Sequence, residues 1–183
     1  MIEKIYQKFL ESTGICTDTR NISEGNLFVA LQGPNFNANK FAARAIEKGA
    51  IAAIIDDRDY AIPGKTIYIE DGLQALQELA KIHRKSLKIP IIGITGSNGK
   101  TTTKELVHAV LSSSFHTFAT KGNLNNHIGV PLSVLSITKD HEIAIIEMGA
   151  NHLGEIALLS SISRPTHGLI TNIGKAHTGL FGG

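Results

Sequence analysis

The feature that most constrains the fold is the segment GITGSNGKTTT, which spans Gly93 to Thr103. An apolar run precedes it, and the residues that follow Lys100 have helical periodicity. A strand, a glycine-rich turn and a helix that opens with Lys-Thr-Thr form the context of a phosphate-binding loop, because backbone N–H groups and the helix dipole attract an anion. The segment therefore predicts an α/β unit that binds a nucleotide.

Several residues of this loop are suited to individual phosphate contacts. Glycines at 96 and 99 let the backbone approach phosphate oxygens closely. Lys100 can place its charge on the β- and γ-phosphates, and the hydroxyl of Thr101 or Thr102 can bind Mg²⁺. These residue types in this context favour the binding of nucleotide phosphates.

The spacing of the glycines departs from the strict phosphate-loop pattern. That pattern requires glycine at position 94, where this chain has Ile94, and Gly93 lies one residue too early. A glycine-rich turn without any ligand is the alternative. The strand before the turn and the helix after it favour phosphate binding.

The second half of the chain alternates between two kinds of hydrophobic pattern. These predict strands at 91–95, 115–120, 143–150 and 166–174, helices at 101–114 and 154–162, and a short helix or turn within 125–137. This alternation is typical of a parallel sheet wound by right-handed crossovers. A sheet of three or four strands is thin, so we expect the natural polypeptide to continue beyond Gly183.

The first half predicts a smaller α/β unit. Helical periodicity occurs at 2–10, 41–49 and 72–87, and apolar strand patterns occur at 27–31, 50–56 and 66–70. Pro90 then opens the next strand, a position where its missing N–H costs little. We therefore expect two domains, 1–88 and 89–183.

Composition excludes several classes of protein. The apolar share of 42% and the formal net charge of +2 are ordinary for a globular protein, and no run of basic residues indicates nucleic-acid binding. The single cysteine, Cys16, excludes an intrachain disulfide and fits a reducing compartment. The longest apolar stretches are too short to span a bilayer, and no secretion signal opens the chain. We expect a soluble cytoplasmic protein without nucleic-acid or membrane partners.

Three later features are expected at the same edge of the sheet as the phosphate loop. Glu147 ends an apolar strand, where a carboxylate can hold Mg²⁺, although it could also be a solvated strand end. His177 follows the next strand, but a lone histidine is more often a surface residue. The loop KGNLNNHIGVPLS, residues 121–133, is a candidate substrate loop, with the alternative that its asparagines only satisfy their own backbone.

Taken together, these segments resemble one enzyme family. The segments are TGSNGKTT, GNLNNHIGVPLS, EMGANHLGEIALL and TNIGKAH, in this order and spacing. They resemble the Mur ligases of peptidoglycan synthesis, whose phosphate loop has the shifted glycine spacing seen here. EMGANH and the Ala-His pair are most similar to the member that adds D-alanyl-D-alanine to UDP-N-acetylmuramoyl-tripeptide. TDTR at 17–20 resembles the family's uridine-site motif.

The resemblance implies a role for each matching residue. Gly96, Ser97, Asn98, Gly99, Lys100, Thr101 and Thr102 would bind the ATP phosphates, with Asn172 near the nucleotide. Thr101, Glu147 and His177 would hold Mg²⁺, and Lys100, Glu147 and His177 would serve catalysis. Asn123, Asn125 and Asn126 would line the muramoyl-peptide site, and Asp18, Thr19 and Arg20 would approach the uridine.

The sequence also departs from the family in two places. Asn37-Ala38-Asn39 stands where the family commonly has Asp-Gly-His, and residues 178–182 differ from the usual Leu-Glu-Gly-Phe-Gly. We assign no site role to these positions.

The implied reaction is the formation of an amide bond through an acyl phosphate, with ATP and Mg²⁺, between UDP-N-acetylmuramoyl-tripeptide and D-alanyl-D-alanine. The family's central domain normally extends further, with a magnesium-binding lysine that is often carbamylated, and a third domain follows it. We therefore expect these 183 residues alone to be inactive. A monomer is favoured, although the sequence leaves the oligomeric state open.

Two other functions remain open at this stage. One is the sister ligase that adds a single amino acid to a UDP-muramoyl-dipeptide, which shares the phosphate loop and TDTR. The other is a nucleotide-binding module that makes no bond. The segments TDTR and GNLNNH argue against a simple module, which has no use for them.

Overall fold

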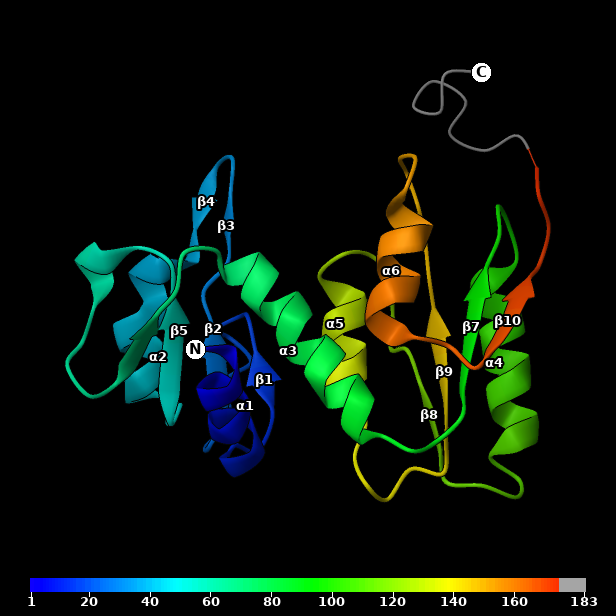
Figure 1. The fold of residues 1–183 in the computed structure, drawn as a ribbon, viewed down its shortest axis with the longest axis horizontal. Helices are drawn as coiled ribbons and strands as arrows, with labels where there is room; N and C mark the ends of the chain where they lie inside the picture. The colour runs from blue at the N-terminus through cyan, green and yellow to red at the C-terminus, as the bar shows by residue number, and fades with distance from the viewer. Residues whose placement is uncertain (175–183) are drawn as a thin grey trace. The chain divides into compact units, whose positions relative to one another are not determined.

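The computed structural model describes residues 1–174, and His177 lies outside them. The chain forms two compact units, Met1–Leu79 and a second unit that begins at Ala80. Each unit contains a four-stranded parallel sheet with helices, so the expected α/β fold class is confirmed (Figure 1).

The division between the units lies within helix α3 (Gly72–Ser86), whereas the sequence places it after residue 88. The last turns of α3 bond to the second unit. The Nε2 atom of His83 is 2.8 Å from the carbonyl oxygen of Ile137, and the Nε of Arg84 donates to that of Ser163 at 2.8 Å. These long-range contacts place the last turns of α3 with the second unit.

The first unit begins with α1 (Ile2–Glu11), which buries Ile5 and Phe9 on one face. The elements that follow are β1 (Ile15–Cys16), β2 (Leu27–Val29), β3 (Gln32–Gly33), β4 (Phe36–Asn37), the 3-10 helix η1 (Ala38–Phe41), α2 (Ala42–Glu47), β5 (Ala52–Ile55), the 3-10 helix η2 (Arg58–Tyr60) and β6 (Thr66–Tyr68). The order in the sheet is β1-β2-β5-β6. A core of alanines, Phe28 and Ile55 lies between this sheet and α2.

Two features of the first unit were not predicted. Strand β1 has two residues, and the β3–β4 hairpin pairs Gln32 with Asn37 and Gly33 with Phe36. Elements this short carry too few residues for a periodic hydrophobic signal. The predicted stop of α2 at Gly49 agrees with the structure, because Gly49 has a φ of +102° just after the helix.

The second unit contains, in chain order, β7 (Ile91–Thr95), α4 (Lys100–Leu111), β8 (Thr117–Ala119), α5 (Gly129–Leu135), β9 (Ile143–Glu147), α6 (Glu155–Ser163) and β10 (His167–Ile170). The order in its sheet is β10-β7-β9-β8, and every pair is parallel. The predicted strands were correct in type; the strand predicted at 91–95 has the bounds of β7, and the other three are shorter than predicted. The short helix expected within 125–137 is α5.

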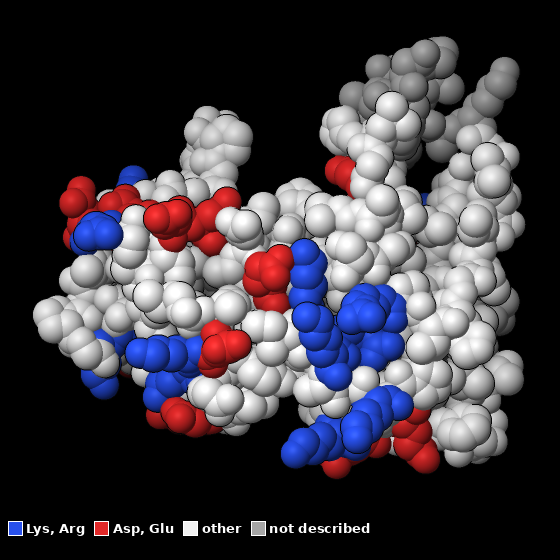
Figure 2. All heavy atoms as spheres, viewed as in Figure 1, with Lys and Arg blue, Asp and Glu red and all other residues white. Residues whose placement is uncertain are grey.

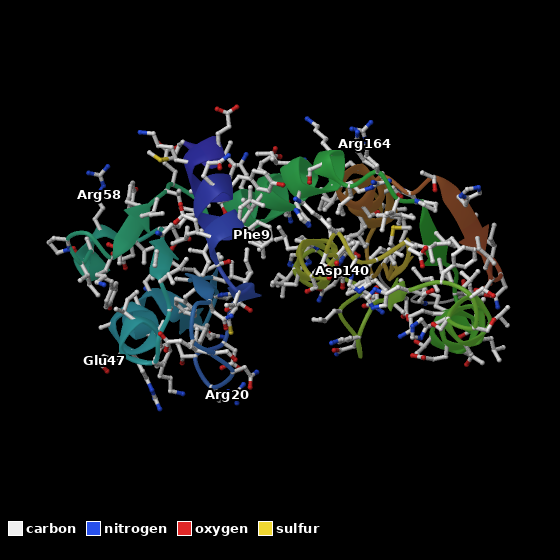
Figure 3. The ribbon with its side chains drawn as sticks, turned by 90° about the horizontal axis from the view of Figure 1, so that it is seen from below. Phe9, Arg20, Glu47, Arg58, Asp140 and Arg164 are labelled. Carbon is white, nitrogen blue, oxygen red and sulfur yellow. The ribbon has the colours of Figure 1, made fainter. Side chains whose placement is uncertain are left out.

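The helices of the second unit cover both faces of its sheet. Helix α4 packs against β7, β8 and β9, whereas α5 packs against β9 and α6 against β7 (Figures 1 and 3). The connection from β7 to β8 runs one way across the sheet, and the two later connections run back. Right-handed crossovers therefore place α4 on one face and α5 and α6 on the other.

The strand register places the carboxyl ends of three strands together. Ile94 of β7 pairs with Glu147 of β9, and Thr95 pairs with Ile170 of β10. The segments that follow these strands therefore leave the sheet at one edge, where ligands bind in open α/β sheets.

No helix among residues 1–174 is long and apolar enough to cross a membrane.

The last turn of α3 carries His83, Arg84 and Lys85, and Figure 2 shows basic side chains gathered over this part of the helix. Cations at a helix C-terminus complement the helix dipole.

Candidate functional site

The predicted phosphate loop connects β7 to α4 in the second unit. Gly96 and Gly99 have φ angles of +137° and +77°, which a residue with a side chain rarely adopts. Gly99 is the N-cap of α4, and no side chain caps this helix end. The N–H groups of the first turn of α4 are therefore available for an anion.

Gly93, which lies one residue too early for the strict phosphate-loop pattern, is within β7 rather than in the loop. A Cβ at this position would lie 2.7 Å from the Cε of Met148 and 3.0 Å from the Cβ of Pro165. The shifted glycine therefore serves close packing of the strand, and Gly96 and Gly99 supply the special backbone angles of the loop.

Residues after β10 hold the loop in place. The Asn98 N–H donates to Oδ1 of Asn172 at 3.0 Å, and the Ser97 N–H donates to the Asn172 carbonyl oxygen at 3.1 Å. The Thr171 hydroxyl donates to the Asn98 carbonyl oxygen at 2.6 Å, and the Gly174 N–H donates to the Ser97 hydroxyl at 2.9 Å. Asn172 therefore supports the loop through its backbone and its carboxamide.

Substitution of Gly96 by alanine should lower the melting temperature of the full-length protein and its affinity for ADP. The alanine would adopt a strained φ, and its Cβ would collide with Oγ1 of Thr171, at a cost of about 1–3 kcal/mol. Gly99→Ala is the matched control, because a Cβ there meets nothing within 4 Å. Equal losses of melting temperature in the two variants, measured by thermal unfolding, would contradict the collision.

The lysine and threonines of the loop lie at the start of α4. The Nζ of Lys100 donates to the carbonyl oxygen of Gly96 at 2.7 Å, which holds the ammonium group against the loop. The Thr101 hydroxyl donates to Oε1 of Glu147 at 3.1 Å, and Thr102 is exposed. The structure thus brings the loop and the predicted metal-binding carboxylate into direct contact.

Glu147 is buried at the end of β9, with 1% of its surface exposed. Its Oε1 accepts hydrogen bonds from Thr101 and, at 2.8 Å, from Nδ2 of Asn125. Its Oε2 is buried and has no hydrogen-bond partner among residues 1–174. Burying a carboxylate oxygen without a hydrogen-bond partner raises the free energy of the folded state, and a bound cation would offset this cost.

This donor set fits Mg²⁺, which prefers oxygen ligands and usually keeps several waters. Glu147 Oε2 and the Thr101 hydroxyl are both oxygen donors. The described part of the chain contains no group of three or more His, Cys, Asp or Glu residues that could hold a metal. The third predicted ligand, His177, lies outside the described residues.

The asparagines of the 121–133 loop have different surroundings. Asn125 contacts Glu147, whereas Oδ1 of Asn126 accepts from the N–H groups of Ile128 and Gly129 at the start of α5. Asn123 is exposed. The alternative considered from sequence, that these side chains satisfy local backbone, therefore describes Asn126, while a substrate contact stays a prediction for all three.

The first unit contains a pocket of about 490 Å³ around the TDTR segment. Its lining residues are Thr17, Asp18, Thr19, Arg20, Phe28, Phe36, Ala38, Phe41 and Arg44. Thr19 is largely buried, and its carbonyl oxygen accepts from Nζ of Lys48 at 2.7 Å. Arg20 lies on the loop after β1 (Figure 3). The pocket offers cationic and aromatic side chains, a combination suited to a nucleotide.

Asp18 and Arg20 form a paired contact at this pocket. The Arg20 guanidinium donates to both carboxylate oxygens, at 2.9 Å from Nε and 2.6 Å from Nη2 to Oδ2 and 3.0 Å from Nε to Oδ1. These side-chain hydrogen bonds lower the pKa of Asp18 to about 2. The carboxylate therefore stays ionised at physiological pH and orients Arg20.

The pairing predicts how Asp18 responds to acid. Because its folded pKa is depressed, the contribution to stability is complete above the unfolded pKa of about 4 and is lost as pH falls through about 2. We expect the Asp18 carboxyl ¹³C signal to stay constant from pH 7 to about 4 and to titrate in that range in Arg20→Gln. Titration of the unaltered protein in that range would contradict the pairing.

The departure at Asn37-Ala38-Asn39 serves the structure of the first unit. Asn39 is fully buried, its Nδ2 donates to Oδ1 of Asp56 at 2.7 Å, and its Oδ1 accepts from the Asp56 N–H at 3.0 Å. The Asn37 side chain accepts from the Asn39 N–H and caps η1. These hydrogen bonds therefore hold η1 against Asp56, the residue that follows β5.

Sequence reasoning missed several residues that shape these sites. They are Thr171 and Gly174 at the phosphate loop, and Phe28, Phe36, Phe41 and Arg44 at the first pocket. Thr171 directly precedes Asn172, so the segment TNIG contained the signal. The aromatic residues are spread over separate elements and share no sequence signal.

Comparison with known proteins identifies the family. The model for the Mur ligase middle domain matches residues 94–183, and the model for the Mur ligase family catalytic domain matches residues 11–84. The chain belongs to the Mur ligase family. The first match ends at residue 84, within α3, and the second begins at residue 94, within β7, so the matches reach both units of this Mur ligase chain.

Individual relatives agree with this assignment. The chain is 49% identical over 171 residues to the UDP-N-acetylmuramoyl-tripeptide–D-alanyl-D-alanine ligase of Synechocystis, a match that covers 92% of this chain and 37% of the relative. Among solved structures, MurF from Acinetobacter baumannii has a TM-score of 0.87 at 36% identity, covering 100% of this chain and 43% of that one. MurF from Thermotoga maritima in complex with ADP has a TM-score of 0.81 at 33% identity, with 93% and 39% covered. This Mur ligase chain therefore spans well under half the length of these relatives.

Proposed function

We propose that the chain is part of an ATP-dependent ligase that joins D-alanyl-D-alanine to UDP-N-acetylmuramoyl-tripeptide in peptidoglycan precursor synthesis. The observation that carries the proposal is the contact between Thr101 of the phosphate loop and the buried Glu147. That contact joins a triphosphate site to a cation site. The relatives named as this ligase, with identities up to 49%, supply the reaction.

The second unit would hold the nucleotide. Residues Gly96 to Thr102 would enclose the ATP phosphates, with the N–H groups of the first turn of α4 donating to them. Lys100 contributes its charge, and Asn172 supports the loop by accepting from the Ser97 and Asn98 N–H groups. Thr101, Glu147 and His177 would hold Mg²⁺, which when bound neutralises charge on the phosphates. The Thermotoga maritima MurF bound to ADP supports an adenine nucleotide for this fold.

The proposed reaction has two steps. The terminal carboxylate of the tripeptide attacks the γ-phosphorus of ATP, ADP leaves, and an acyl phosphate forms. The amine of D-alanyl-D-alanine then attacks the acyl carbon, loses a proton and displaces inorganic phosphate, which leaves an amide. Lys100 stabilises the charge that develops on phosphoryl oxygens, and neither step requires a protein nucleophile.

The residues proposed for the UDP-linked substrate form two sets, one in each unit. Asp18, Thr19 and Arg20 would approach the uridine end from the 490 Å³ pocket, where the fixed guanidinium of Arg20 suits an anionic nucleotide. Asn123, Asn125 and Asn126 would lie toward the muramoyl-peptide. Because ATP and a UDP-linked precursor are both intracellular metabolites, we place the reaction in the cytoplasm. A monomer remains our expectation.

The test uses the full-length enzyme with ATP, Mg²⁺ and UDP-N-acetylmuramoyl-tripeptide. One reaction receives D-alanyl-D-alanine, parallel reactions receive single amino acids, and a further set uses the UDP-muramoyl-dipeptide. Mass spectrometry should find a gain of one dipeptide in the first reaction alone. A gain of a single amino acid on the dipeptide precursor would instead identify the sister ligase, and no gain anywhere would leave a nucleotide-binding module. The 183-residue chain alone should give no product.

A further inference from the structure

The two carboxylate oxygens of Glu147 have different surroundings. Oε1 accepts two hydrogen bonds, from Thr101 and Asn125, whereas Oε2 is buried and has no partner among the described residues. The backbone is fixed as well, because the Glu147 N–H donates to the Thr120 hydroxyl at 3.0 Å. The side chain is therefore held by one oxygen, and the other is free to face a cation.

Asn125 is itself held on several sides. Its carbonyl oxygen accepts from the Gly149 N–H at 2.8 Å, and its own N–H donates to the Asn123 carbonyl oxygen at 2.8 Å. A Cβ at Gly149 would lie 3.2 Å from each of three carboxamide atoms of Asn125, so this glycine allows the close approach. The carboxamide thus has a defined position between the candidate substrate loop and the end of β9.

We propose that Asn125 is a positioning residue for the metal-binding carboxylate, and that it couples the candidate substrate loop to the cation site. The inference rests on the proposed function. Its Nδ2 cannot ligate a cation, because an amide nitrogen has no available lone pair, but it donates to Oε1 and so leaves Oε2 as the oxygen for the cation. Thr101 acts in parallel, since its hydroxyl can donate to Oε1 while its oxygen faces the cation.

This role separates Asn125 from its two neighbours. The carboxamide oxygen of Asn126 accepts from the N–H groups of Ile128 and Gly129 at the start of α5, and Asn123 is exposed on the same loop. The Asn125 N–H donates to the Asn123 carbonyl oxygen. A shift of Asn123 on contact with the peptide substrate would therefore move Asn125, which donates to Glu147. Substrate contact that fixes the position of Asn125 should tighten cation binding, and thermodynamic linkage then requires the cation to tighten substrate binding by the same factor.

The experiment measures Mn²⁺ binding to the full-length enzyme in the presence of ADP, by electron paramagnetic resonance of the free ion. Asn125→Ala should weaken Mn²⁺ binding by about tenfold or more, the usual effect of losing a residue that orients a metal ligand. Asn123→Ala, on the same loop, should leave Mn²⁺ affinity within about twofold. Metal-free ADP affinity and circular dichroism check the fold, and Asn125→Ser, which is too short to reach Glu147, provides a second variant.

The same titration with UDP-N-acetylmuramoyl-tripeptide tests the coupling. The substrate should tighten Mn²⁺ binding to the unaltered enzyme, and this effect should disappear in Asn125→Ala and Asn125→Ser. Unchanged Mn²⁺ affinity in both Asn125 variants, or equal losses in Asn123→Ala, would overturn the inference while leaving the ligase function intact. An absence of nucleotide-dependent Mn²⁺ binding in the unaltered enzyme would contradict the proposed function itself.

Discussion

Lys100→Met should reduce kcat of the full-length enzyme by about 10²- to 10³-fold, the effect of removing one preorganised group that stabilises charge in a transition state. The Nζ of Lys100 lies 2.7 Å from the carbonyl oxygen of Gly96, so its charge is held within the loop where phosphate would bind. Methionine has a similar length and keeps helix propensity, but it has no charge. Measured as phosphate release at saturating ATP, the loss should fall on kcat.

Lys139→Met is the matched control for this substitution. Lys139 is exposed in the turn before β9, at the opposite end of the strand from Glu147. Removing its charge should leave kcat unchanged, because a solvated charge there is far from the phosphate edge and screened by salt. Activity of Lys100→Met within about tenfold of the unaltered enzyme would rule out a transition-state role for this lysine.

Glu147→Gln should abolish most of the Mg²⁺-dependent activity, by about 10²-fold or more, and should not lower the melting temperature. The glutamine carbonyl oxygen can still accept from Thr101 and Asn125, so the local structure is kept. Its amide group in place of Oε2 cannot bind a cation. Because a neutral amide costs less to bury than an unpaired carboxylate oxygen, stability should be equal or higher.

The control lies at the other end of the same strand. Glu142 precedes β9 and accepts from the His116 N–H at 2.8 Å, on an exposed part of the second unit. Glu142→Gln should leave Mn²⁺ affinity and turnover unchanged. Full activity of the Glu147→Gln enzyme at limiting Mg²⁺ would show that this carboxylate does not bind the cation. A large decrease in its melting temperature would contradict the expectation that burial of Oε2 destabilises the fold.

Much of the second unit could be predicted from short sequence segments, because its hydrophobic patterns and motifs are strong and each lies within a few consecutive residues. The apolar run before Gly96 forms β7, the Lys-Thr-Thr opening begins α4, and Glu147 ends β9 as its place after an apolar run predicts. Each of these depends on periodicity or on glycine chemistry within about ten residues. The β3–β4 hairpin and the aromatic lining of the first pocket have no such signal, since their residues are short or scattered along the chain.

Local sequence determined which residues could contact a phosphate or a cation, because glycine, lysine and carboxylate groups have fixed chemical abilities. Tertiary structure decided how they are arranged. The bond between Asn98 and Asn172 joins residues 74 positions apart, and those from Thr101 and Asn125 to Glu147 join residues 46 and 22 apart. The parallel register of β7, β9 and β10 brings these residues to one edge. Sheet register depends on the packing of the whole unit. Local sequence therefore cannot predict which carboxylate oxygen of Glu147 accepts hydrogen bonds and which has no partner among the described residues.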